Sequence, residues 1–300
     1  MIASFTPERR ARVGDIELAY ETIGGPAGQP MLLIMGLAAQ MILWPDGLCR
    51  RFADRGFFVI RFDNRDCGRS TVLDRAGRPS LQAVLARRAR PPYELTDMAA
   101  DAAGLLDHLG ITAAHVVGAS LGGMIAQTLA IERPERVLSL ASIMSTTGNG
   151  RVGQPTPEAL EVLMTRPPLD DRSAFVESTI AARAVIGSRG LERDEEWTRA
   201  IAGRSFDRGI HPDGTLRQLA ASIASRNRTE RLRQIDVPTV VIHGTDDPLI
   251  DASGGRATAE AIPGAELVLI DGMGHDLPPA AWDRIVDAVA ANAARSAARR

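Results

Sequence analysis

Short, nearly continuous apolar runs recur along the chain, with helical patterns between them. A run this short and this apolar is typical of a β-strand that is covered on both faces. Helical spacing is clearest over 95–109, where Thr96 can cap the helix and Gly110 ends it. Alternation of this kind predicts a mostly parallel sheet with helices on both faces. The runs are 31–35, 57–62, 114–117, 137–141, 239–243 and 266–270.

The strand-helix alternation is interrupted once. Residues 148–236 are rich in arginine, helical in period and broken by several prolines, and they contain no apolar strand run. The alternation then resumes and ends with an amphipathic helix at about 280–297. We therefore predict a core formed by residues 1–147 and 237–300, into which a helical cap, residues 148–236, is inserted.

Composition excludes several classes of protein. All 35 basic residues are arginine, which excludes a Schiff-base lysine, a Ser-Lys dyad and a phosphate-binding loop that needs lysine. The net charge of −2 offers no basic surface for nucleic acid. Because no run approaches a membrane span and no secretory signal is present, we expect a cytoplasmic protein without a membrane partner. Cys49 and Cys67 are too few for a disulfide framework or a four-ligand zinc site.

The segment GASLGG, residues 118–123, follows a strand run directly and precedes a helical pattern over 124–132. In this context the turn forces Ser120 into a strained backbone conformation that projects its hydroxyl. Gly118 and Gly122 let strand and helix approach each other, and the helix N-terminus favours negative charge nearby. The alternative is a glycine-rich turn without chemistry, since the bare motif also arises by chance. The strand-turn-helix placement favours Ser120 as a nucleophile.

A serine nucleophile needs a base within hydrogen-bond reach and a carboxylate that holds the base in one tautomer. In this architecture the acid and then the histidine follow the serine, each on a loop after a later strand. His275 is the histidine that follows the last strand run, on a glycine-rich loop. The loop after 239–243 offers Asp246, Asp247 and Asp251 as the acid. The other histidines, for which we expect structural roles or exposure, are His108, His115, His211 and His243.

Acyl transfer also needs donors for the negative oxygen of its intermediate, and each backbone N–H is worth about 2.7–4 kcal/mol. We assign one donor to the N–H of Leu121, the residue after the nucleophile. The second assignment is the N–H of Leu37, which with Gly36 lies in the loop after run 31–35. The alternative for that loop is a simple turn.

These residues resemble the α/β-hydrolase superfamily over nearly all of the chain except 148–236. The segment FDNRDCGRST, residues 62–71, is similar to the family's D-x-R-G-x-G-x-S loop, with Asp66 where glycine is commoner. Met35-Gly36, Trp44-Pro45 and the segment GMGHDLP, residues 272–278, are similar to the branch that contains aclacinomycin methylesterase. That enzyme hydrolyses a carboxylic methyl ester on an anthracycline. Most members of the superfamily carry histidine where this chain has Met35, which agrees with the methylesterase branch.

The resemblance implies an α/β-hydrolase fold with a mostly parallel eight-stranded sheet, a helical cap over the active site and no cofactor or metal. It also favours Asp247 as the acid, because this residue stands three after Gly244 and just before a proline, where the family places it. Apolar residues of the cap either line the pocket or form the core of the cap, and the second role is commoner. These residues are Met164, Leu169, Phe175, Trp197 and Phe206.

We therefore predict a serine hydrolase that cleaves a small-molecule carboxylic ester through an acyl-enzyme, with a methyl ester as one candidate. Ser120 attacks, His275 moves the proton and Asp247 orients the histidine. One alternative is another reaction on the same triad, such as that of an aminopeptidase, a lactonase, a carbon-carbon bond hydrolase or a perhydrolase. The other is a nearly non-catalytic ligand receptor. We expect a monomer or a homodimer.

Overall fold

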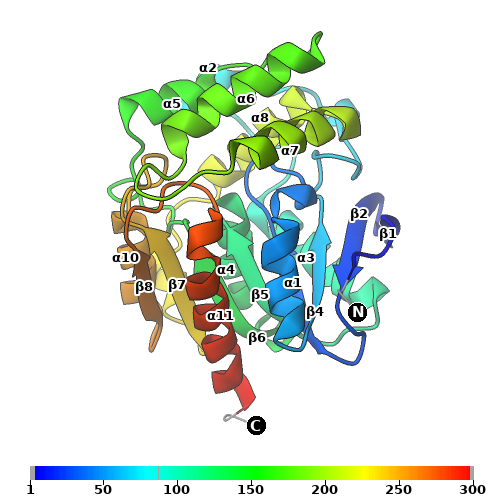
Figure 1. The fold of residues 1–300 in the computed structure, drawn as a ribbon, viewed down its shortest axis with the longest axis vertical. Coiled ribbons are helices and arrows are strands. Elements are labelled where there is room, and N and C mark those ends of the chain that lie inside the picture. The colour runs from blue at the N-terminus through cyan, green and yellow to red at the C-terminus, as the bar shows by residue number, and fades with distance from the viewer. Residues whose placement is uncertain (1–3, 87, 298–300) are drawn as a thin grey trace.

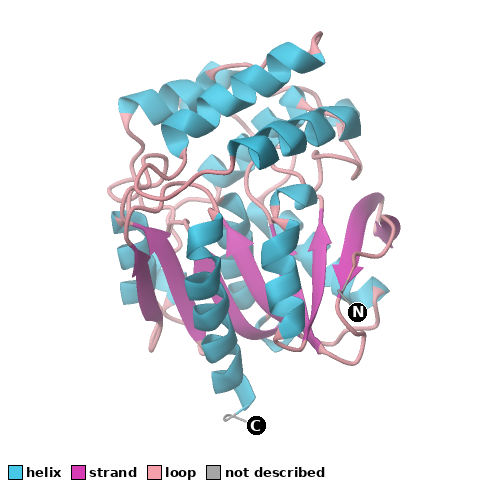
Figure 2. Cartoon of the chain, viewed as in Figure 1, coloured by secondary structure: helices cyan, strands magenta, loops and turns pink. Residues whose placement is uncertain are grey.

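A computed structural model describes residues 4–86 and 88–297. In these residues one sheet of eight strands runs through the molecule in the order β1-β2-β4-β3-β5-β6-β7-β8 (Figures 1 and 2). β2 pairs antiparallel with β1 and with β4, and all other pairs are parallel. The predicted mostly parallel eight-stranded sheet is confirmed. The strands are β1 (Arg9–Val13), β2 (Ile16–Ile23), β3 (Gln29–Ile34), β4 (Phe57–Phe62), β5 (Ala114–Ala119), β6 (Val137–Ile143), β7 (Thr239–Gly244) and β8 (Glu266–Ile270).

Helices cover both faces of the sheet, with α1 and α11 on one face and α3, α4 and α10 on the other (Figure 1). Strand β3 shows why helices must cover both faces of the sheet. Leu32 and Ile34 pack towards α3 and α4, whereas Met31 and Leu33 pack towards α1 and α11, because successive side chains of a strand point to opposite faces. The helices of these layers are α1 (Asp46–Asp54), α3 (Leu95–His108), α4 (Leu121–Glu132), α10 (Ser253–Ala261) and α11 (Trp282–Ala297).

The regular secondary structure described between β6 and β7 consists of helices, and α5 to α8 lie over one edge of the sheet (Figure 1). Phe175 and Phe206 lie with their ring centroids 5.4 Å apart and share a small core with Val176 and Ala202. These two rings therefore belong to the interior of the helical segment. The division of the chain at residues 148 and 236 stays a prediction. The helices are α5 (Pro157–Met164), α6 (Arg172–Ile186), α7 (Glu195–Arg208), α8 (Pro212–Ala224) and α9 (Thr229–Leu232).

Short helices complete the described structure. Among the described residues, none of the helices combines the length and the hydrophobicity that a membrane span requires. The remaining α-helix is α2 (Leu81–Leu85), and the 3₁₀ helices are η1 (Met41–Leu43), η2 (Asp74–Ala76), η3 (Pro134–Arg136) and η4 (Pro279–Ala281).

The predicted cap of helix α3 is wrong. The helix begins at Leu95, so Thr96 already lies inside its first turn. The N-cap is Glu94, whose backbone N–H donates to the Asp97 carboxylate at 2.7 Å in a capping box. This pairing of Glu94 with Asp97 satisfies the exposed donors of the helix end without Thr96.

A buried ion pair joins α8 to the loop after β4. Arg217 donates Nε–H and an amino N–H to the two carboxylate oxygens of Asp66 at 2.8 and 2.7 Å, and both side chains are at most 1% exposed. Tyr93 and the N–H of Leu73 also donate to this carboxylate. Asp66 has φ +66°, which explains why glycine is commoner here. Burial would raise the pKa of Asp66, but the hydrogen bonds and the charge of Arg217 outweigh it and lower the pKa.

Replacing Arg217 by leucine should lower the free energy of unfolding at pH 7 by roughly 3–5 kcal/mol, because Asp66 then stays buried without its cation. In the wild type, the low pKa of Asp66 contributes stability above its unfolded pKa of about 3.9, and this contribution is lost as the pH falls through the lower folded value. Urea unfolding of both proteins should therefore show a difference that shrinks as the pH falls below about 4.

The matched control is Arg172→Leu, which breaks an exposed pair with Asp207 on the same helical segment. We expect this control to lose about 1 kcal/mol or less. Equal losses for the two variants, or a loss in Arg217→Leu that does not change with pH, would contradict the role of the buried pair.

Candidate active site

Ser120 occupies the turn that leads from β5 into α4. Its backbone has φ 56° and ψ −121°, a conformation that costs a residue with a side chain about 1–3 kcal/mol. The turn is held to the end of β6: the N–H of Ser120 donates to the Ile143 carbonyl at 2.9 Å, and its carbonyl accepts from Ser145 Oγ at 2.8 Å. The N–H of Gly123 donates to the same carbonyl at 2.9 Å. These bonds maintain the strained conformation that the motif predicts.

The turn also depends on close contact between backbones. A Cβ atom at Gly118 would lie 2.1 Å from the carbonyl oxygen of Gly122, and one at Gly122 would lie 2.0 Å from that of Ile34. Neither position can accept a side chain without moving α4 away from β3 and β5. The loop after β3 passes beside Ser120, since a Cβ atom at Gly36 would lie 3.1 Å from Ser120 Cβ.

The structure brings Ser120, His275 and Asp247 into one hydrogen-bonded line. His275 Nε2 lies 3.0 Å from Ser120 Oγ, and His275 Nδ1 lies 2.8 Å from Asp247 Oδ2. An ionised carboxylate only accepts hydrogen bonds, so Nδ1 carries the proton and Nε2 is free to accept the serine proton. Asp247 is fixed in turn, because its Oδ1 accepts the N–H groups of Leu249 and Ile250, both at 2.9 Å.

Electrostatics keep Asp247 ionised. Burial alone would raise the pKa of this carboxyl, but the charge and hydrogen bond of His275 and those of His243 outweigh burial. Together they hold the pKa of Asp247 well below its usual range. A carboxylate in this state can stabilise an imidazolium as it forms.

The neighbouring acid and most of the remaining histidines lie elsewhere. Asp246 is exposed and accepts a hydrogen bond from Thr245 Oγ1 at 2.9 Å.

His115 forms hydrogen bonds with Ser139 and Gln29 inside the sheet. His211 Nε2 lies 2.9 Å from the Gly68 carbonyl, and His108 packs edge-on against Tyr20. Asp251 bonds the N–H of Ser253.

His243 is a fully buried second imidazole beside the acid. Its Nε2 lies 2.7 Å from the carbonyl oxygen of Ile250 and 3.4 Å from Asp247 Oδ2. Since a carbonyl only accepts, Nε2 carries a proton that is directed towards the loop of Asp247. Sequence reasoning missed this contact, because an apolar strand run shows only that His243 is buried.

The two predicted backbone donors come from the start of α4 and from the loop after β3. Leu121 is the first residue of α4, where an N–H has no acceptor within the helix. The N–H of Leu37 forms no hydrogen bond to another described residue. Its neighbour Ala38 has φ 56° and donates its N–H to Gln218 Oε1 of α8 at 2.9 Å.

The loop that carries Leu37 is held at both ends by residues of segment 62–71. Asn64 Nδ2 donates to the carbonyl of Met35 at 2.9 Å, and the N–H of Met41 donates to Asp63 Oδ1 at 2.7 Å. Asn64 and Asp63 belong to the sequence motif that resembles the family's shaping loop. Their positions explain why that loop matters for the site.

A model of the alpha/beta hydrolase fold matches residues 29–278 of the chain. The chain belongs to the α/β-hydrolase family. This hydrolase is similar to the rhodomycin D methylesterases of Streptomyces sp. strain C5 (30% identical) and Streptomyces peucetius (29% identical), each over 95% of this chain and 98% of the relative. A solved enol-lactonase from Burkholderia xenovorans LB400 has the same fold, with a TM-score of 0.70 and 22% identity over 97% of this chain and all of the other. The resemblance predicted from the sequence is confirmed.

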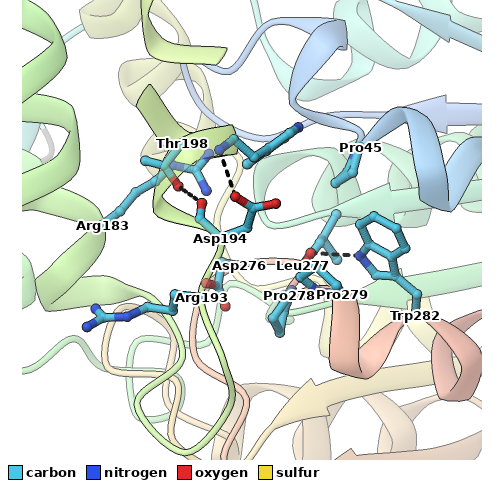
Figure 3. Close-up of a pocket in the computed structure, with 11 residues that line it drawn as sticks. Pro45, Arg183, Arg193, Asp194, Thr198, Asp276, Leu277, Pro278, Pro279 and Trp282 are labelled. Atoms are coloured by element: carbon cyan, nitrogen blue, oxygen red, sulfur yellow. Dashed lines mark hydrogen bonds between the residues drawn. The ribbon is translucent and has the colours of Figure 1, made fainter. Parts of the chain in front are cut away.

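A cleft of this hydrolase lies beside the segment that follows His275, between that segment and helices α6 and α7 (Figure 3). Trp197, one of the predicted candidates for a pocket wall, lines it together with Arg183, Asp276 and Trp282. Asp194 caps α7 by accepting the N–H of Trp197 at 2.7 Å. Trp197 therefore borders this cleft, whereas Phe175 and Phe206 belong to the interior of the helical segment.

Replacing Asp247 by asparagine should lower kcat by about 10⁴-fold. The amide oxygen would stay on the N–H groups of Leu249 and Ile250, so the amide NH₂ would face His275 Nδ1 and force the imidazole into the wrong tautomer. Steady-state hydrolysis of p-nitrophenyl butyrate measures the effect. The control Asp246→Asn changes an exposed neighbour and should stay within about twofold of wild type, as expected of surface changes. Similar losses in both variants would contradict the assignment of the acid.

Proposed function

We propose that this hydrolase cleaves carboxylic esters through an acyl-enzyme intermediate. Ser120 acts as the nucleophile, His275 as the general base and acid, and Asp247 as the group that orients and stabilises the histidine. The observation that supports this proposal most directly is the pair of contacts at 3.0 and 2.8 Å that joins the three side chains. Such a line is the geometry that an activated serine requires.

In the acylation half, Ser120 Oγ attacks the ester carbonyl carbon while its proton moves to His275 Nε2. The carbonyl π electrons become an oxyanion, which the N–H groups of Leu37 and Leu121 stabilise. When the intermediate collapses, the bond to the alcohol oxygen breaks, and His275 returns the proton to that oxygen. The products of this half are the free alcohol and Ser120 esterified by the acyl group.

In the deacylation half, water replaces the alcohol at the same base. His275 Nε2 takes a proton from water as the water oxygen attacks the acyl carbon, and the same backbone donors stabilise the second oxyanion. Collapse breaks the bond to Ser120 Oγ, which recovers its proton from His275. The acid is released and the enzyme is restored.

We further propose a methyl ester of a bulky carboxylic acid as the substrate class, with helices α5 to α8 as a cap that covers the site. The similarity to two methylesterases over 95% of the chain supports the ester type. The position of α5 to α8 over one edge of the sheet supports the cap, as does the hydrogen bond that Ala38, in the loop of Leu37, donates to Gln218 of α8. A methyl leaving group needs little space, so the cap would mainly accommodate the acyl part.

Replacing Ser120 by alanine should lower kcat for p-nitrophenyl butyrate by about 10⁶-fold, because no other group can accept the acyl chain. The same change should abolish covalent labelling by a fluorophosphonate, as followed by intact-protein mass spectrometry. Circular dichroism serves as the control for folding. Turnover by a folded Ser120→Ala variant would refute the proposed nucleophile.

A substrate panel separates the ester reading from other reactions of the same triad. We expect kcat/KM for methyl esters of aromatic acids to exceed that for lactones and aminoacyl anilides by at least about tenfold, which corresponds to about 1.4 kcal/mol in the transition state. Product release is followed with time. Sustained turnover supports an enzyme, whereas a single stoichiometric burst would favour the ligand receptor.

A further inference from the structure

The end of α6 and the loop that follows it, residues 186–190, lie directly against the loop that carries the base, residues 272–278. The backbone N–H of His275 donates to the carbonyl of Ile186 at 2.8 Å. Further along, the N–H of Gly190 donates to the carbonyl of Gly272 at 3.3 Å. The main chain of the base is therefore bonded to the helical segment between β6 and β7 as well as to the sheet.

Ser188 bonds the residues on both sides of His275. Its hydroxyl oxygen accepts the N–H of Gly274 at 2.9 Å, and its hydroxyl proton is donated to Asp276 Oδ1 at 2.5 Å. The N–H of Ser188 donates to the same carboxylate oxygen at 3.1 Å. Ser188 is completely buried, so water does not compete for these bonds.

No side chain separates the two loops at this contact. A Cβ atom at Gly274 would lie 2.4 Å from the carbonyl carbon of Gly187, and one at Gly190 would lie 2.8 Å from the Cα atom of Gly272. Backbones in such contact cannot shift independently, because protein interiors are close-packed. A displacement of the end of α6 therefore moves the main chain at His275 directly.

Asp276 lines the cleft (Figure 3). Among the described residues, Ser188 supplies the hydrogen bonds that this carboxylate accepts. Arg183 of α6 interacts electrostatically with this carboxylate and also lies over the ring of Trp197, 5.3 Å from its centroid. The contact with Ser188, rather than a direct ion pair, therefore holds the Asp276 side chain in place.

We propose that Ser188 is a positioning residue for His275. By bonding Gly274 and Asp276 at once, Ser188 sets the main chain of the base and so the 3.0 Å approach of His275 Nε2 to Ser120 Oγ. The inference rests on the proposed function, because it assigns the support of the same base. The proposed role also makes the geometry of Ser120, His275 and Asp247 depend on the position of the end of α6.

Replacing Ser188 by alanine removes one acceptor and one donor and creates no new bulk. Misplacement of a catalytic group by a fraction of an ångström is expected to lower kcat by about tenfold or more. KM for p-nitrophenyl butyrate should change little, since the acyl and alcohol parts do not contact Ser188 in this scheme. The control is Ser173→Ala, an exposed serine at the other end of α6, which should match wild type. An unchanged kcat in Ser188→Ala would overturn the proposal.

Two variants of Asp276 test whether position or charge matters, and they apply even where Ser188→Ala folds poorly. Asparagine keeps an oxygen acceptor for Ser188 but removes the charge, whereas alanine removes both. We expect Asp276→Asn to retain clearly more of kcat than Asp276→Ala, measured well below both melting temperatures. Equal losses would show an effect of charge and would overturn the positioning role.

Fluorophosphonate labelling gives a second readout of the base. The rate constant of labelling should fall in Ser188→Ala by the same factor as kcat, since both require His275 to take the proton of Ser120. Loss of thermal stability alone, with labelling at the wild-type rate, would reduce Ser188 to a structural residue. The Ser120→Ala variant is assayed in parallel. Activity in that variant would refute the proposed function, whereas an inactive Ser120→Ala beside a fully active Ser188→Ala refutes only this inference.

Discussion

The strained turn at Ser120 is the constraint on which the other parts of the site depend. A positive φ at a residue with a side chain persists only where surrounding bonds maintain it, and here β6 and α4 both do so. The turn requires backbone contact between α4 and strands β3 and β5, which explains the glycines at 118 and 122. The same contact brings the loop after β3 beside Ser120. One local strain thus sets the relative places of Ser120, the N-terminus of α4 and the loop of Leu37.

The three polar side chains come from the ends of three parallel strands, β5, β7 and β8, and the sheet makes their meeting possible. Parallel strands end at the same edge of the sheet. Ser120 and Asp247, which are 127 residues apart in sequence, and Asp247 and His275, which are 28 apart, therefore become neighbours. The acid is then held by two backbone N–H groups and approached by two imidazoles. Its low pKa is a consequence of that arrangement, because burial alone would act in the opposite direction.

Much of the core could be predicted from the sequence because its signals are local. A short apolar run identifies a covered strand, and the spacing of glycine, serine and proline identifies the loops that follow β5, β7 and β8. The cap of α3 was predicted wrongly because Thr96 and the pair Glu94 and Asp97 compete for the same helix end, and only the structure shows which is used. His243 and Gln218 were missed for a different reason. Each acts through a partner that pattern alone does not place next to it, as in the bond between Gln218 and Ala38, 180 residues apart.

The support of the site is therefore divided between two parts of the chain with different demands on their sequence. The sheet carries Ser120, Asp247 and His275, whereas α6 and α8 supply bonds to the loops of His275 and Leu37. Under the proposed function, a helical segment that adapts to a new acyl group must keep these bonds or lose the geometry of the proposed base and backbone donors. The proposal thus couples substrate choice to catalytic geometry, because the same helices would contact the substrate and hold the loops.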